Sequence, residues 1–113
     1  MDSIIAVLLA LAAARATAPP GAIGSFSVET SARDYPIEAL RLQQEGETTV
    51  ELRIDRKGRV KECAVLVSSG SLYLDAGTCQ VMMDKGRFDF AKGGRPKAGP
   101  SVISQRLAWR LPR

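Results

Sequence analysis

Apolar and charged residues alternate in the middle of the chain. Val50, Leu52 and Ile54 are each separated by one charged residue, a period of two that predicts a half-buried strand. Residues 55–58 form a polar turn that ends in a glycine, which suits the left-handed position of a hairpin. Residues 60–67 then predict the returning strand. The pattern therefore predicts an antiparallel β-hairpin.

A short helix is predicted before this hairpin. Pro36 suits a first helical turn, and residues 37–44 follow it with apolar side chains near helical spacing. Ile37, Leu40 and Leu42 are expected to face the core.

A longer helix is predicted after the hairpin, over residues 72–85. Ser71 is a suitable N-cap, and Gly86 ends the helix. The expected inward stripe consists of Leu72, Ala76, Cys79 and Met82 or Met83. The adjacent methionines could instead form an adaptable binding patch, but their helical spacing favours the core.

Alternation returns in the last part of the chain. Phe88 and Phe90 predict a short extended segment that closes the core. Residues 101–111 predict the last strand, and Pro112 ends it. The inward side chains of that strand would be Ile103, Leu107, Trp109 and Leu111.

The order helix–strand–strand–helix–strand predicts an α+β fold. We expect a three-stranded antiparallel sheet with two helices on one face, a split βαβ arrangement. The second helix returns the chain, so the last strand lies antiparallel beside the first. That last strand would then form an open edge of the sheet.

The N-terminal residues are typical of an export signal. The apolar run over residues 4–14 would span only about 17 Å as a helix, against about 30 Å for a bilayer core. Ala14-Arg15-Ala16 fits the Ala-x-Ala cleavage pattern, which predicts a signal peptide over residues 1–16 and an exported protein. The alternative is a buried N-terminal helix. Residues 17–33 are interpreted as a short flexible linker, and residues 34–113 as the folded domain.

Composition argues against catalysis. The chain of 113 residues has no histidine, so neither a Ser-His nor a Cys-His pair can form, and the commonest neutral metal ligand is missing. Ser68, Ser69 and Ser71 stand near Asp75, but a serine-rich helix start is typical of capping. We expect no enzyme activity, no metal site and no cofactor.

Positive charge is concentrated in the C-terminal part. The net charge is +4, and residues 85–113 contain eight basic residues against Asp89 alone. This half is either a solvated face or a surface that binds an anionic envelope component, as an accessory or structural module would. Export and the scarcity of aromatic residues argue against nucleic acid.

The two cysteines predict a disulfide. Cys63 and Cys79 are sixteen residues apart, which fits neither a redox C-x-x-C motif nor a zinc site. On the predicted fold they lie on facing surfaces of a strand and a helix. In an exported protein such a pair forms a bond, which would stabilise the fold by about 3 kcal/mol.

The motifs together resemble the C-terminal domain of TonB-family energy transducers. The resemblance runs from Tyr35 to Leu111 and is carried by the order and spacing of several short motifs. These are Tyr35-Pro36, Glu45-Gly46, Gly58-Arg59-Val60, Ser68-Ser69-Gly70-Ser71, Leu74-Asp75, Arg87-Phe88 and Gly93-Gly94-Arg95-Pro96.

This resemblance implies a periplasmic domain with a binding function in energy-coupled transport. The partner would be the N-terminal box of a TonB-dependent outer-membrane transporter, which adds as a strand beside the last strand. The alternative use of this open edge is self-association with a second copy of the chain, and no small-molecule substrate is implied. Carried over to this chain, the partner-binding residues are Ser101, Val102, Ser104, Arg106, Ala108 and Arg110.

Overall fold

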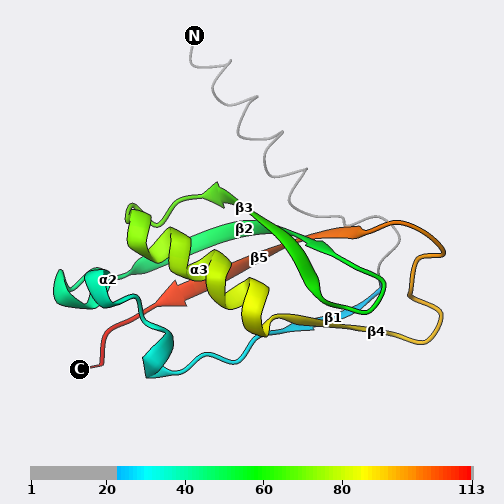
Figure 1. Cartoon of the computed structure of the whole chain (residues 1–113), viewed down its shortest axis with the longest axis horizontal. Helices are drawn as coiled ribbons and strands as arrows, with labels where there is room; N and C mark the ends of the chain where they lie inside the picture. Colours follow the sequence, from blue (N-terminus) through cyan, green and yellow to red (C-terminus); the bar gives the residue numbers. More distant parts are fainter. Residues whose placement is uncertain (1–22, 113) are drawn as a thin grey trace, which may run out of the picture.

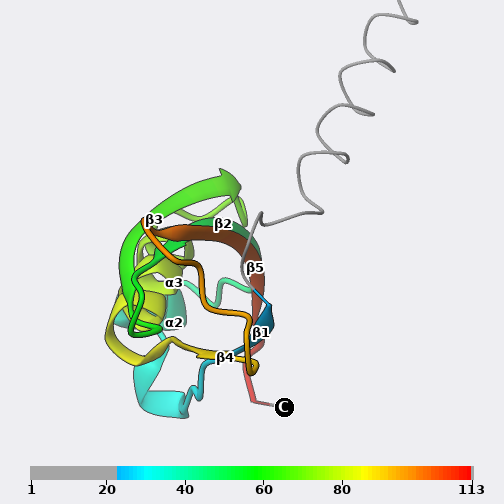
Figure 2. The same cartoon turned by 90° about the vertical axis from the view of Figure 1, so that its right-hand side faces the viewer.

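The computed structural model describes residues 23–112 as an α+β fold with one main sheet (Figure 1). The sheet is antiparallel in the order β3-β2-β5 and consists of β2 (Gly46–Ile54), β3 (Val60–Val67) and β5 (Ser101–Trp109). Figure 2 shows the sheet curving over α3 (Leu72–Lys85), with α2 (Ile37–Arg41) on the same side. The predicted split βαβ arrangement is confirmed, with the last strand beside the first strand of the hairpin.

The hairpin forms as its sequence pattern predicts. Val50, Leu52 and Ile54 of β2 are fully buried, and the charged residues between them are exposed. Gly58 closes the turn with φ of +86°, and a Cβ there would lie 2.1 Å from the carbonyl oxygen of Phe88. Glycine is therefore required both by the backbone conformation and by the close approach of the chain.

The inward face of α3 differs from the predicted stripe. Ser71 caps the helix, since its hydroxyl accepts the backbone N–H of Leu74 at 3.2 Å. Cys79 and Met82 face the core as predicted, but Leu72 is 85% exposed and Ala76 is also exposed. The residues buried in their place are Leu74, Asp75, Thr78 and Val81. Asp75 and Thr78 are polar, but they lie on the inward face because each forms hydrogen bonds with groups inside the fold.

The short helix α2 also differs from its prediction. The helix contains five residues and ends at Arg41, and Ala39 is its buried residue. Ile37, Leu40 and Leu42, which were predicted to face the core, are 66%, 45% and 58% exposed. In so short a helix, the close packing of Pro36 against Gly77 decides the inward face. A Cβ at Gly77 would lie only 2.5 Å from the Cγ of Pro36.

A second, two-stranded sheet was not predicted. β1 (Gly24–Ser27) pairs antiparallel with β4 (Arg87–Phe90), with Gly24 opposite Phe90 and Ser27 opposite Arg87. The extended segment around Phe88 is confirmed by β4. The linker interpretation is wrong for residues 24–27, because a strand of four mostly small residues becomes ordered only when a distant partner strand supplies its hydrogen bonds.

Two apolar clusters and one disulfide hold the layers together. The larger cluster joins the three main strands to Met82 and Phe88, and the smaller joins Ala39, Leu74, Val81 and Trp109. The predicted Cys63–Cys79 bond links β3 to α3, with a Cα–Cα distance of 5.6 Å. No helix among residues 23–112 is long and apolar enough to cross a membrane. The expected signal peptide, residues 1–16, lies outside the described residues.

Candidate partner-binding edge

β5 forms an outer strand of the main sheet with a regular backbone. Its nine residues pair with β2 in one continuous antiparallel register, from Ser101 opposite Ile54 to Trp109 opposite Gly46. Within residues 23–112, β5 pairs on this one side and no other strand pairs with it. A long edge without a bulge is the kind that accepts an added strand.

The opposite edge of the sheet is irregular. The register between β3 and β2 shifts twice, between Thr49 and Val50 and again between Arg53 and Ile54. Such irregularities disturb the ladder and raise the local twist, which discourages pairing with another chain. β3 is also tied to α3 through Cys63. Of the two outer strands, β5 is therefore the better template for an incoming strand.

The direction of the β5 backbone groups follows from the hairpin turn. The N–H of Asp55 donates to the carbonyl of Arg59 at 2.9 Å, so the backbone of Asp55 points toward β3. Backbone groups alternate in direction along a strand. The intervening residue Ile54 therefore points toward β5, where it meets Ser101. It follows that odd-numbered residues of β5 point toward β2, and even-numbered residues point toward the open edge.

The predicted binding side chains separate into two groups. Ser101 is 3% exposed and belongs to the helix-side face, so its side chain is not presented to a partner. The other five lie on the opposite, solvent-side parity: Val102 and Ser104 are partly buried, and Arg106, Ala108 and Arg110 are exposed. Arg110 lies one residue beyond the end of β5.

An acidic residue of β2 pairs with the two arginines of this group. Glu47 lies opposite Ala108, and its carboxylate is 3.7 Å from Arg106 and 3.9 Å from Arg110. Glu47 was not singled out from the sequence. The alternation of apolar and polar residues along β2 places Glu47 on the solvent face. Its position beside the arginines could be predicted only from the order of the strands in the sheet. Exposed pairs of this kind contribute at most about 1 kcal/mol.

The C-terminal end of β5 is firmly anchored. The ring N–H of Trp109 donates to the Thr78 hydroxyl at 2.8 Å, and that hydroxyl donates to the Leu74 carbonyl at 2.7 Å. The ring of Tyr35 contacts Trp109 edge-on at 5.3 Å, and its hydroxyl donates to the Gln44 carbonyl. Burial raises the pKa of Tyr35 above its usual value of 10.0, which keeps the hydroxyl a donor at neutral pH.

The serine cluster near Asp75 forms a structural hydrogen-bond network. Asp75 is 8% exposed, and its carboxylate accepts the Ser69 N–H and hydroxyl at 2.9 and 2.8 Å and the Thr48 hydroxyl at 2.9 Å. The Ser68 hydroxyl also donates to it. Burial acts to raise the pKa of Asp75, but the hydrogen bonds from Ser68, Ser69 and Thr48 outweigh it, so the pKa lies below 3.8. An ionised carboxylate saturated with donors is a structural clamp between β2 and the start of α3.

The family model described as Gram-negative bacterial TonB protein C-terminal matches residues 31–111. The chain belongs to this family. The solution NMR structure of the Pseudomonas aeruginosa TonB CTD is similar, with a TM-score of 0.59 and 23% sequence identity over 77% of this chain and 84% of that chain. At that identity the likeness supports the fold alone. No curated protein sequence matches the chain.

Family membership establishes the broad function. TonB C-terminal domains are periplasmic in Gram-negative envelopes, take part in energy-coupled transport with TonB-dependent receptors, and are not enzymes. The sequence resemblance from Tyr35 to Leu111 is thereby confirmed. Ser68, Ser69 and Ser71 have capping and clamping roles in this domain. Within the part of the chain that the structure describes, no three His, Cys, Asp or Glu residues are grouped to hold a metal ion.

Proposed function

We propose that this TonB C-terminal domain binds the N-terminal box of a TonB-dependent outer-membrane transporter by strand addition along β5. The observation that carries the proposal is the contrast between the two outer strands. β5 keeps nine residues in one register, whereas the β3 register shifts twice. Even-numbered residues of β5 direct their backbone groups to the open side, where an extended peptide would find them.

The side chains of the edge would supply selectivity. Arg106 and Arg110 are exposed, and within residues 23–112 each forms its ion pair with Glu47. Because those ion pairs are weak, the arginines can exchange Glu47 for an acidic side chain of the partner at little cost. Ala108 between them leaves room for a neighbouring side chain. Backbone pairing would therefore give affinity, and the arginine pair would favour partners with acidic residues.

Amide NMR spectra with a transporter-box peptide test the proposal. We expect the largest chemical-shift changes at residues 102–108 and small changes along β3, because the added strand contacts only the open edge. The titration should be run where sedimentation shows a monomer, since a second copy of the chain could pair at the same edge. Shift changes confined to β3 or to α2 would show that the partner binds elsewhere.

The proposed function requires that the chain is exported. We infer that residues 1–16 are removed in the periplasm, leaving the linker from Thr17 attached to the domain. N-terminal sequencing of protein recovered from cells is expected to begin near Thr17. A chain that still begins with Met1 in the membrane fraction would contradict removal and would indicate a retained membrane segment.

A further inference from the structure

Basic residues from two distant parts of the sequence meet at one end of the domain. The β2–β3 turn, residues 55–61, lies beside β4 and the loop that follows it, residues 87–97 (Figures 1 and 2). We call these two segments the basic pole. They hold two acidic residues and eight basic ones, a net charge of +6 in a chain whose total is +4. The basic ones are Arg56, Lys57, Arg59, Lys61, Arg87, Lys92, Arg95 and Lys97.

Backbone contacts hold the two segments together. The N–H of Phe88 donates to the Gly58 carbonyl at 2.8 Å, and Arg59 forms a β-bridge with Arg87. The side chain of Arg56 donates to the Pro96 carbonyl at 3.1 Å. The glycine at position 58 permits this approach, because a Cβ at that position would collide with the backbone of Phe88. The sheet topology therefore places like charges side by side, an arrangement that costs stability unless an anion compensates it.

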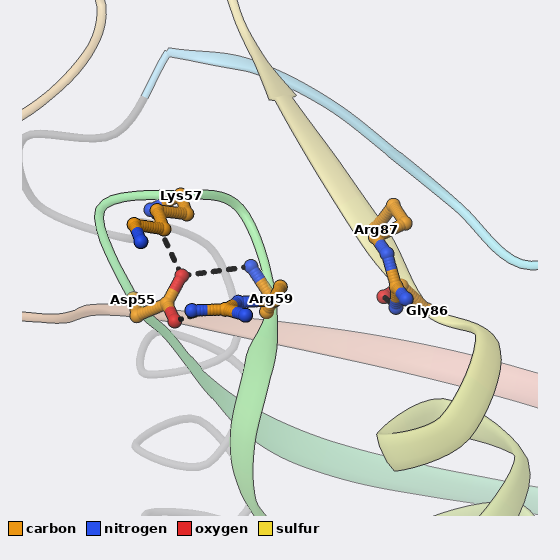
Figure 3. Close-up of polar contacts among 5 residues, drawn as sticks. All are labelled: Asp55, Lys57, Arg59, Gly86 and Arg87. Carbon is orange, nitrogen blue, oxygen red and sulfur yellow. Dashed lines mark hydrogen bonds and ion pairs between the residues drawn. The ribbon is translucent and has the colours of Figure 1, made fainter.

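Little of this charge is neutralised within the domain. Asp55 forms an ion pair with Arg59 at 3.3 Å and also accepts the backbone N–H groups of Lys57 and Arg59 (Figure 3). The guanidinium of Arg87 turns back to the Gly86 carbonyl, away from the Asp55 carboxylate. Within residues 23–112, Arg59 alone among the eight forms an ion pair. All eight residues are exposed.

The chain enters the domain at the same pole. The N–H of Ile23 donates to the Gly94 carbonyl at 3.2 Å, and its carbonyl accepts the N–H of Ala91 at 2.8 Å. Its side chain is 65% exposed, so an apolar group stands among the cations.

We propose that the basic pole binds the anionic phospholipid surface of a membrane. Long, flexible and exposed Lys and Arg side chains suit the diffuse field of many headgroup phosphates. Each cation near such a surface contributes about 1 kcal/mol, and the attraction falls off within a Debye length. The pole adjoins only the Ser101 end of β5, whereas Arg106 and Arg110 lie toward the other end of the strand-addition edge and pair with Glu47. Membrane contact would hold the domain near the bilayer with the β5 edge still available.

Vesicle co-sedimentation of the purified chain tests this inference. The probe is a vesicle of equal parts phosphatidylcholine and phosphatidylglycerol, and the reference is pure phosphatidylcholine. We expect binding to the mixed vesicle that declines steeply between about 0.05 and 0.5 M salt. Replacing three lysines of the pole, Lys57→Gln, Lys92→Gln and Lys97→Gln, should lower the partition coefficient about a hundredfold.

A matched variant separates the pole from net charge. Arg33→Gln, Arg41→Gln and Arg53→Gln remove the same charge outside the pole and should change binding less than about threefold. Equal losses in the two variants, or equal binding to pure phosphatidylcholine, would overturn the proposal. Binding to soluble polyglutamate but not to vesicles would do so as well and would indicate an acidic protein partner. Box-peptide affinity should be unchanged in the pole variant, so failure here is distinguishable from failure of strand addition.

Discussion

Replacing Ala108 by proline is expected to weaken binding of a transporter-box peptide by about tenfold to a hundredfold without unfolding the domain. Ala108 is exposed, and by its position in β5 its N–H points to the open edge. Proline removes that donor, and its ring obstructs an incoming strand, whereas the ladder with β2 is left intact. Isothermal titration with the peptide measures the loss, and circular dichroism confirms the fold.

Two further substitutions make this result specific. Ala108→Val keeps the N–H and suits a strand, so binding should stay within about threefold of the parent. Gln105→Pro removes a donor that points toward β2, so it should lower the melting temperature instead. A folded Ala108→Pro variant that binds as tightly as the parent would exclude strand addition at this edge. Val102→Pro provides an independent repeat near the other end of β5.

Replacing Asp75 by alanine is expected to lower the free energy of unfolding by about 3 kcal/mol or more. The substitution removes the shared acceptor of the Thr48, Ser68 and Ser69 hydroxyls, and Thr48 is fully buried. Asp84→Ala on the exposed side of the same helix is the control and should change stability by less than about 0.5 kcal/mol. Urea denaturation measures both. Equal, small effects would show that the clamp contributes nothing.

The pH dependence of stability provides a second readout of Asp75. Its pKa is lower in the folded state than the usual 3.8, so the unfolded chain takes up the proton more readily. The stabilisation is therefore fully present above about pH 4 and is lost as the pH falls through the folded-state pKa. Asp75→Ala should flatten this part of the stability curve, while Asp84→Ala should preserve it.

Local patterns predicted most of the elements. The alternation of Val50, Leu52 and Ile54 and the N-cap at Ser71 act within a few residues, so they could be recognised without the fold. The pairing of Cys63 with Cys79 needed only a strand and a helix in contact. The open edge at β5 followed from the order of the elements, because a returning helix places the last strand beside the first.

The errors arose where distant residues decide burial. Leu72 is apolar and stands at the start of a helix, yet it is 85% exposed because α3 turns Leu74 and Asp75 inward instead. Hydrophobic periodicity predicts an apolar stripe and cannot anticipate a buried carboxylate with four donors. Ile37 was misplaced for a related reason, since contact between Pro36 and Gly77 orients a helix too short to have its own periodic face.

By itself, the sequence determined the secondary-structure order, the disulfide partners and the TonB C-terminal family, because these depend on short-range spacing and on residue type. Only the tertiary structure decided which outer strand is regular, since the two shifts in β3 arise from its pairing with β2. It also brought Glu47 beside Arg106 and gathered the basic pole from segments about thirty residues apart. Such groupings depend on strand register and on the close approach of backbones, which are properties of pairs of distant segments and leave no periodic signal in either one.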